Sequence, residues 1–309
     1  MKLTIATRES PLALWQANHV KTTLLKHFPD LQVELLGMTT KGDQLLSSPL
    51  SKIGGKGLFI KELEVAMLEG HADIAVHSMK DVPMASQLPD GLSVPVVMKR
   101  EDPRDALVSR RYTSLESLPH GAIVGSCSLR RRAQIQALRP DLVLKDLRGN
   151  VNTRLQKLDN GEFDAIILAA AGLKRLGFED QISEYLADTV SLPAVGQGAI
   201  GIECKSDNEA VLKLIMTLND PDTAICVKAE RAFNARLNGG CQAPIAGFAQ
   251  LTESGLYLRG LVGDLDHGTI LFHEITGRPE DAEAIGTALA DHLLAQGAKE
   301  ILDKIYGQA

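Results

Sequence analysis

The sequence predicts an α/β protein with two lobes, a cleft between them, and a third α+β domain with a three-stranded antiparallel sheet. In the first two thirds of the chain, short apolar runs alternate with helical patterns, which is typical of βαβ units and mostly parallel sheets. That alternation restarts after residues 100–103, REDP, and so indicates a second lobe. The last third changes to an amphipathic helix followed by three strand-like runs, which indicates a separate α+β domain.

The first lobe is expected to be discontinuous, over 1–98 and 194–218, with the second lobe at 99–193 and the third domain at 219–309. After a strand at 2–7, Ser10 and Pro11 have the residue types of an N-cap and a first helical position, so a helix is expected to about residue 27. The other elements predicted for the first lobe are strands at 32–38, 73–77 and 192–203 and helices at 58–69 and 208–218. Segment 41–57 is rich in Gly and Ser and has no clear period, which predicts a mobile loop and a candidate active-site lid.

The second lobe repeats the alternation of strands and helices. Its strands are predicted at 106–109, 122–125, 142–147 and 164–169, and its helices at 129–138 and 151–158. Two lobes between which the chain crosses twice resemble the architecture of bilobal binding proteins, whose ligands occupy the cleft.

The third domain begins with a helix predicted at 222–237. One stripe of that helix is apolar, with Glu230 and Arg231 off it. Strands at 243–251, 255–262 and 269–275 are separated by turn sequences such as ESG and DLDHG, which predict an antiparallel meander. A final helix is expected over 280–306.

Composition narrows the class of protein. No apolar run is long enough for a signal peptide or a membrane span, and the four cysteines lack disulfide or zinc spacing, so a cytoplasmic protein is expected. A net charge of -6 argues against a nucleic-acid binder. Basic residues are nevertheless concentrated between 130 and 154, which indicates a cleft that attracts a small anionic ligand.

Two predicted strand-to-helix junctions carry these basic residues. Ser128, Arg130 and Arg131 stand at the start of one helix, and Arg148 and Arg154 stand around the start of the next. Helix N-termini attract anions, and the planar arginine fork pairs well with carboxylates. Capping serines with a solvated arginine face would be the alternative, but two adjacent cationic helix starts favour a ligand with several carboxylates.

Other motifs are less specific. Residues 196–201 fit the GxGxxG pattern, but a strand-like segment follows in place of a helix, so close backbone packing is the better interpretation. No histidine has the spacing of a metal site. Lys80 and Asp81 follow a predicted buried strand, where α/β sites gather, although Asp81 before Val-Pro could also be a turn residue.

Cys241 follows Gly239 and Gly240, either of which could take a positive φ and end the preceding helix. A helix C-terminus disfavours a thiolate, whereas Cys127 lies among arginines at a helix N-terminus. Local physics therefore does not identify Cys241 as the reactive cysteine.

Nine motifs, in order along nearly the whole chain, resemble the porphobilinogen deaminase family. They are TRESPLALWQ, GGKGLFIKELE, ADIAVHSMKDVP, REDPRDA, GSCSLRRRAQ, LRGNVNTRL, DAIILAAAGLKRLG, LPAVGQGAIGIE and GGCQAPIAG. This resemblance implies a transferase, also called hydroxymethylbilane synthase, of tetrapyrrole biosynthesis. Such an enzyme joins four porphobilinogen molecules into hydroxymethylbilane with release of ammonia, on a covalently bound dipyrromethane cofactor.

The resemblance also implies roles for individual residues. It places the cofactor thioether on Cys241, and an electrophilic pyrrole partner removes the need for a strong thiolate. Asp81 would stabilise the cation left by loss of ammonia and move protons. Carboxylates of cofactor and substrate would be bound by Arg8, Ser10, Lys80, Ser128, Arg130, Arg131, Arg148, Arg154 and Arg175. The lid loop would contain Lys52, Lys56 and Phe59.

One position departs from the family pattern, because Cys127 stands where a small hydroxyl residue is common; we expect it to be tolerated. The resemblance further implies a monomer with no metal, membrane or nucleic-acid partner. An alternative from a different class is a non-catalytic bilobal module that binds small anions, which would leave its cysteines unmodified.

Overall fold

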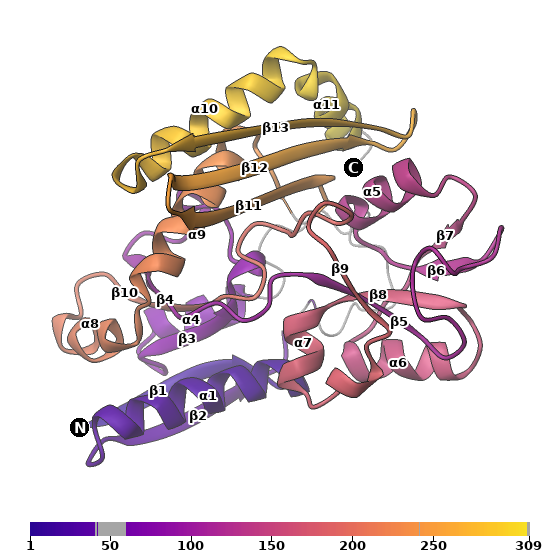
Figure 1. Ribbon diagram of the computed structural model, residues 1–309. Coiled ribbons are helices and arrows are strands. Elements are labelled where there is room, and N and C mark those ends of the chain that lie inside the picture. Colours follow the sequence, from indigo (N-terminus) through magenta and orange to yellow (C-terminus); the bar gives the residue numbers. More distant parts are fainter. Residues whose placement is uncertain (41, 43–59, 241, 308–309) are drawn as a thin grey trace. The chain divides into compact units, whose positions relative to one another are not determined.

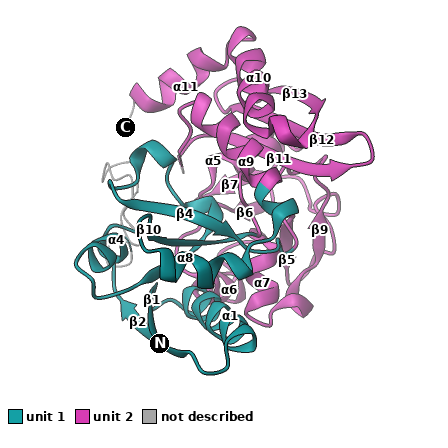
Figure 2. Ribbon diagram, turned by 90° about the vertical axis from the view of Figure 1, so that its left-hand side faces the viewer, with its two compact units in different colours: residues 1–101, 199–224 teal, residues 102–198, 225–309 magenta. Residues whose placement is uncertain are grey.

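The computed structural model describes residues 1–40, 42, 60–240 and 242–307 (Figure 1). Contacts divide the chain into two compact units (Figure 2). Unit 1 contains Met1–Glu101 and Ala199–Ala224, and unit 2 contains Asp102–Gly198 and Ile225–Ala309. The predicted loop at 41–57 lies outside the described residues except for Gly42.

Unit 1 is built on a five-stranded sheet of order β2-β1-β3-β10-β4. Its strands are β1 (Lys2–Arg8), β2 (Gln32–Met38), β3 (Ile74–Ser78), β4 (Leu92–Val97) and β10 (Ile200–Lys205). β1 is parallel to β2 and β3, whereas β10 is antiparallel to β3 and β4, so the sheet is mixed and not mostly parallel as expected. Strand β4 was not predicted; it contains Pro95 and lies at the sheet edge, where proline is tolerated.

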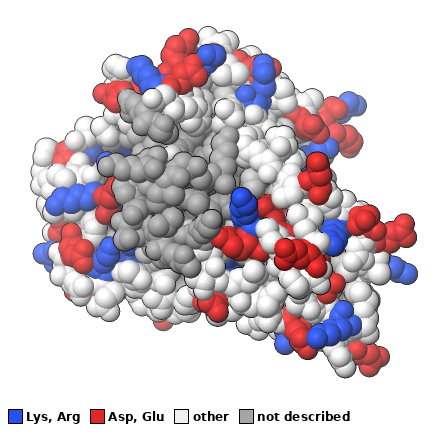
Figure 3. Space-filling view, turned by 180° about the vertical axis from the view of Figure 1, so that it is seen from behind, with Lys and Arg blue, Asp and Glu red and all other residues white. Residues whose placement is uncertain are grey.

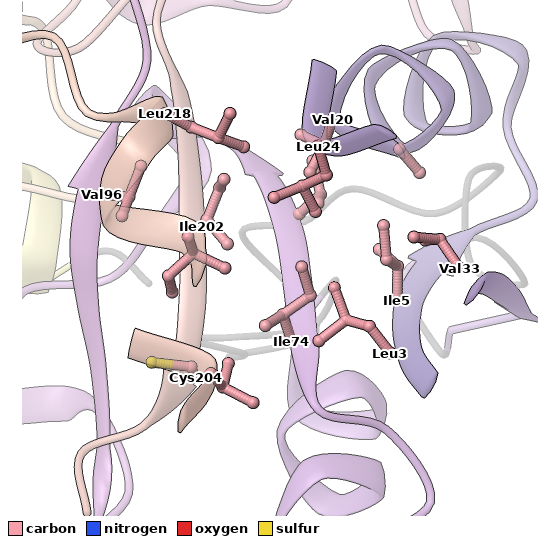
Figure 4. Close-up of a cluster of buried hydrophobic side chains, with 14 of the residues drawn as sticks. Leu3, Ile5, Val20, Leu24, Val33, Ile74, Val96, Ile202, Cys204 and Leu218 are labelled. Atoms are coloured by element: carbon pink, nitrogen blue, oxygen red, sulfur yellow. The ribbon is translucent and has the colours of Figure 1, made fainter. Parts of the chain in front are cut away.

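Helices cover both faces of this sheet. They are α1 (Pro11–His27), α4 (Lys61–Leu68) and α8 (Glu209–Ile215), with 3₁₀ turns η1 (Met79–Asp81), η2 (Ala85–Gln87) and η4 (Met216–Leu218). Ser10 caps α1 by accepting a hydrogen bond from the Ala13 N–H, and Pro11 begins the helix, as predicted. One core brings α1, α8 and the sheet together around residues such as Ile74 and Ile202 (Figure 4). A second core packs α4 on the other face.

Unit 2 contains a second five-stranded sheet, of order β7-β6-β8-β5-β9. Its strands are β5 (Asp105–Ser109), β6 (Ile123–Gly125), β7 (Val143–Lys145), β8 (Ala165–Ala169) and β9 (Glu184–Leu186). β6 is parallel to β7 and β8, but β5 is antiparallel to β8 and β9, so this sheet is also mixed. Its helices are α5 (Leu129–Leu138), α6 (Val151–Asp159) and α7 (Ala170–Arg175), with η3 (Glu179–Gln181). α5 has the predicted bounds, whereas β9 and α7 were not predicted.

A three-stranded antiparallel sheet completes unit 2, as predicted. It is formed by β11 (Ile245–Thr252), β12 (Gly255–Asp264) and β13 (Thr269–Gly277), in that order. Helices α9 (Pro221–Arg236) and α10 (Ala282–Ala295) share a core with it, and η5 (Pro279–Asp281) precedes α10. The single final helix expected over 280–306 is wrong, because α10 and α11 (Ala298–Gly307) are separated at Gly297. The φ of 100° at Gly297 is one that glycine adopts readily and that ends a helix.

The surface mixes both signs of charge. On the face drawn in Figure 3, basic and acidic side chains are interspersed around the part shown in grey. Across the described ranges, no helix combines the length and apolar character needed to cross a membrane.

Candidate active site

In unit 1, the predicted site residues follow the carboxyl ends of two parallel strands. β1 ends at Arg8 and is followed by Ser10, while β3 ends at Ser78 and is followed by the η1 turn with Lys80 and Asp81. Because β1 and β3 pair in parallel, these ends lie at the same edge of the sheet. Unit 1 therefore brings Arg8, Ser10, Lys80 and Asp81 to one edge.

The η1 turn is held firmly at its start and is exposed at its end. Gln16 Nε2 donates to Ser78 Oγ at 2.8 Å, and the Met79 N–H donates to the Ala199 carbonyl at 3.0 Å. Met79 is buried, whereas Asp81 is exposed. The fold thus presents the Asp81 carboxylate to solvent from a fixed backbone.

In unit 2, the parallel strands β6, β7 and β8 bring the other candidates to one sheet edge. Ser128 is the N-cap of α5 after β6, Arg148 and Arg154 flank the start of α6 after β7, and Arg175 ends α7 after β8. Arg154 Nε donates to the Gly149 carbonyl at 2.8 Å, and Arg148 lies 3.7 Å from an Asp146 oxygen.

Arg130 and Arg131 are buried, so the alternative interpretation of a solvated arginine face on this helix is wrong for these two residues. Both donate to the carboxylate of Asp105, which is itself fully buried, with the shortest distance 2.8 Å from each guanidinium. Ser191 and Gln197 also donate to this carboxylate, at 2.8 and 2.9 Å. Burial by itself would raise the pKa of Asp105, but the charges of Arg130 and Arg131 outweigh that effect and hold the pKa well below its ordinary value.

This cluster of Arg130, Arg131 and Asp105 has a net charge of +1. Each guanidinium uses three of its five N–H groups in the hydrogen bonds within unit 2, counting those to the carbonyls of Leu192 and Ile167. Buried charges are normally paired, so the excess positive charge favours an additional anion. The cluster is therefore suited to hold a carboxylate.

The GxGxxG segment is structural, as its sequence context indicated. The Gly196 N–H donates to Glu230, Gln197 donates to Asp105, and the Gly198 carbonyl accepts from Arg175 at 2.7 Å. Gly196 and Gly198 have φ values of 71° and 89°, so residues 195–198 form turns and the strand predicted at 192–203 begins only at Ile200. Through these turns, the candidate site residue Arg175 is linked to the segment that contacts the buried carboxylates of Glu230 and Asp105.

Gly201 confirms the predicted close packing within that segment. A Cβ there would lie 2.8 Å from the sulfur of Met79, the first residue of η1. A larger side chain at this position would therefore force the buried Met79 side chain, at the start of the turn that carries Asp81, to move.

Cys241, Lys52, Lys56 and Phe59 lie outside the described residues. Cys127 is half-buried at the start of α5, and its thiol is free. The expectation that Gly239 or Gly240 takes a positive φ is wrong, because Asn238 does so, with a φ of 52°. Asparagine tolerates this conformation at the end of a helix; Gly239 is needed for space, since a Cβ there would collide with Asn234.

Sequence reasoning missed three buried acids around the candidates. Asp105 holds two arginines, and Glu203 contacts His77 at 2.8 Å. Glu230, expected off the apolar stripe, is fully buried and accepts from the N–H groups of Gly196 and Ala249. The signal for Asp105 was an acid directly before an apolar run, and the signal for Glu203 was an acid between Ile202 and Cys204 in a buried strand.

Two family models match the chain in order. Residues 3–213 match "porphobilinogen deaminase, dipyromethane cofactor binding domain", and residues 224–295 match "porphobilinogen deaminase, C-terminal domain". Together they span most of the chain and include every described residue of the candidate site.

Solved structures of binding proteins are also similar in part. A nutrient-binding protein from Burkholderia cenocepacia bound to methionine is 12% identical, with 72% of this chain and 93% of that chain covered and a TM-score of 0.43. An arginine-specific periplasmic binding protein from Salmonella typhimurium is 16% identical, with 72% and 93% covered and a TM-score of 0.42.

Proposed function

The chain belongs to the porphobilinogen deaminase family, and from this premise we propose how its own residues divide the work of the reaction. Its activity is the condensation of porphobilinogen into hydroxymethylbilane with release of ammonia, in tetrapyrrole biosynthesis. Family membership also decides against the non-catalytic anion-binding module.

The net positive cluster in unit 2 is the observation that carries the proposed site. Each pyrrole ring of cofactor and substrate bears an acetate and a propionate, and the cluster of Arg130, Arg131 and Asp105 has one positive charge in excess. Arg130, Arg131 and Ser128 would hold carboxylates of the dipyrromethane, which supplies the pyrrole carbon to which substrate is joined. A charge-assisted hydrogen bond contributes about 1.5–3 kcal/mol, so each arginine matters to binding by roughly tenfold or more.

Lys80 and Asp81 would also contact the cofactor, whereas the remaining arginines and Ser10 bind substrate carboxylates. Arg148, Arg154 and Arg175 follow the parallel strands of unit 2, while Arg8, Ser10 and Lys80 gather at the sheet edge of unit 1. The lid residues Lys52, Lys56 and Phe59 would close over the bound rings. Two separate sets of carboxylate-binding groups suit a chain of rings that lengthens during the reaction.

Asp81 acts on the reacting pyrrole. Loss of ammonia leaves a cation, and a carboxylate about 4 Å away at an effective dielectric of about 20 interacts with it by about 4 kcal/mol. Stabilisation expressed only in the transition state lowers the barrier by the same amount. The exposed Asp81 carboxylate can also accept and return protons.

We predict that Asp81→Asn loses most of the turnover, because it removes the negative charge, whereas Asp81→Glu retains part of it. Initial rates of hydroxymethylbilane formation, measured per cofactor-loaded enzyme, test this. Equal rates for Asp81→Asn and wild type would remove Asp81 from the mechanism.

Cys241 holds the cofactor through a thioether. The test is the intact mass of purified protein from cells that make porphobilinogen, with Ehrlich's reagent to stain pyrrole. Wild type and the control Cys127→Ser should both carry the added mass, and Cys241→Ser should lack it. An unmodified wild type, or a modified Cys241→Ser, would overturn this assignment.

The three-part division at 98/99, 193/194 and 218/219 remains part of the proposal, supported by a separate hydrophobic core beside each sheet. We also propose a monomeric enzyme in the cytoplasm, on the family resemblance. The elution volume of the purified enzyme in size-exclusion chromatography tests the monomer.

A further inference from the structure

A buried histidine–carboxylate contact lies two residues before the turn that carries Lys80 and Asp81. His77 Nε2, on β3, is 2.8 Å from Glu203 Oε2, on β10. Their side chains are only 6% and 1% exposed. In the antiparallel register His77 pairs with Gly201 and Glu203 pairs with Ala75, so the two side chains lie on the same face of the sheet, two residues apart.

A third ionisable group faces this pair from helix α4. Glu64 is buried, and its pKa is raised to about 6, mainly by burial and then by the charge of Glu203, against the opposing effects of His77 and Lys61. The surrounding residues on this face are apolar: Ala6, Leu63, Ala66, Met67 and Ala75. Apolar side chains in place of His77, Glu203 and Glu64 would fill the same space without the cost of removing three ionisable groups from water. Stability alone therefore does not account for the cluster.

Glu203 is also incompletely satisfied. Its Oε1 is buried and has no hydrogen-bond partner among the residues that the structure describes. Among the described residues, the His77 side chain is therefore the group that orients this carboxylate. Because no other described donor reaches this carboxylate, loss of the His77 contact would leave Glu203 without a side-chain hydrogen bond.

His77 is separated from the η1 turn by Ser78 alone. β10 fixes the same junction through the backbone, since Ser78 pairs with Ile200 and the Met79 N–H donates to Ala199. The Met79 side chain packs over Gly201, the residue opposite His77. Any shift of His77 relative to β10 therefore moves the start of η1.

We propose that His77 and Glu203 are positioning residues for the reaction: the contact between their side chains ties the end of β3 to β10 and so sets where η1 places Lys80 and Asp81. The proposal rests on the role of Asp81 proposed above. Displacement of a catalytic group by about 1 Å can lower a rate by up to about a hundredfold.

The test compares Glu203→Gln, His77→Gln and the double variant with wild type. For Glu203→Gln we expect kcat per cofactor-loaded, folded enzyme to fall by roughly tenfold, with KM for porphobilinogen changed less than about twofold, because the arginines remain in place. The double variant should recover part of the loss, since two amides can hydrogen-bond without a buried charge. Glu64→Gln is the matched control in the same cluster and should keep the kcat of wild type.

Normal kcat in folded Glu203→Gln would overturn the proposal, as would a loss that Glu64→Gln shares. If Glu203→Gln does not fold, the double variant provides the test. A kcat of the double variant close to that of wild type supports the pair. A kcat of the double variant as low as that of folded His77→Gln refutes it. Asp81→Asn is assayed in parallel. Full activity of Asp81→Asn would refute the role of Asp81, whereas an inactive Asp81→Asn beside a normal Glu203→Gln would refute only the positioning pair.

Discussion

Replacement of Asp105 by Asn should destabilise the protein more than any exposed charge substitution. The Asp105 carboxylate is fully buried and accepts from Arg130, Arg131, Ser191 and Gln197. Asn removes the negative charge, leaves two buried guanidinium groups without a counterion, and turns an N–H₂ group toward donors. Removal of one partner from a buried pair costs about 3–5 kcal/mol, and we expect a loss of that size in the free energy of unfolding.

The assay is guanidinium unfolding at neutral pH, followed by circular dichroism. Asp146→Asn is the matched control, because Asp146 also pairs with an arginine, Arg132, at 2.7 Å, but its side chain is 55% exposed. An exposed pair contributes about 1 kcal/mol or less, so the control should unfold close to wild type. A loss below about 1 kcal/mol for Asp105→Asn would refute the reasoning that this carboxylate neutralises the buried arginines.

Three further outcomes follow from the structure. Because burial raises the folded-state pKa of Glu64 to about 6, this carboxyl costs stability as pH rises through that value. At pH 7.5 the free energy of unfolding of Glu64→Gln should therefore exceed that of wild type by up to about 2 kcal/mol, as measured by denaturant unfolding. At pH 4, where the carboxyl is protonated, the variant and wild type should have the same stability. Gly286→Ala should lower the melting temperature despite the better helix propensity of alanine, because the new Cβ would collide with the Ala229 carbonyl of α9. Arg139→Lys should lose about 1–3 kcal/mol in urea unfolding, because lysine cannot reproduce the guanidinium contacts with Asp141 and the carbonyls of Leu115 and Leu118.

Features set by neighbouring residues were predictable. The Ser10 and Pro11 signals placed the start of α1, periodicity placed β2 and α5, and turn residues separated the three strands of the last sheet. Motif order along the chain identified the family. These signals are carried by residues a few positions apart, so the sequence expresses them directly.

Strand direction, buried pairing and the helix break at Gly297 were missed or misjudged. β10 returns to the first sheet after the chain has built the second, and whether it runs parallel or antiparallel to β3 depends on where that excursion ends. Among the described strands, the short edge strands β4 and β9 pair with β10 and β5 alone. Local propensity contains no information about such neighbours.

The sequence by itself determined the kinds of elements, the concentration of arginines at two helix starts, and the family to which the chain belongs. Only the tertiary structure decided that Arg130 and Arg131 are buried against Asp105, and that His77 meets Glu203 from a position 126 residues away. The physical reason is that burial and charge pairing are properties of side chains brought together by the folded chain, whereas helix, strand and turn preferences belong to each short segment.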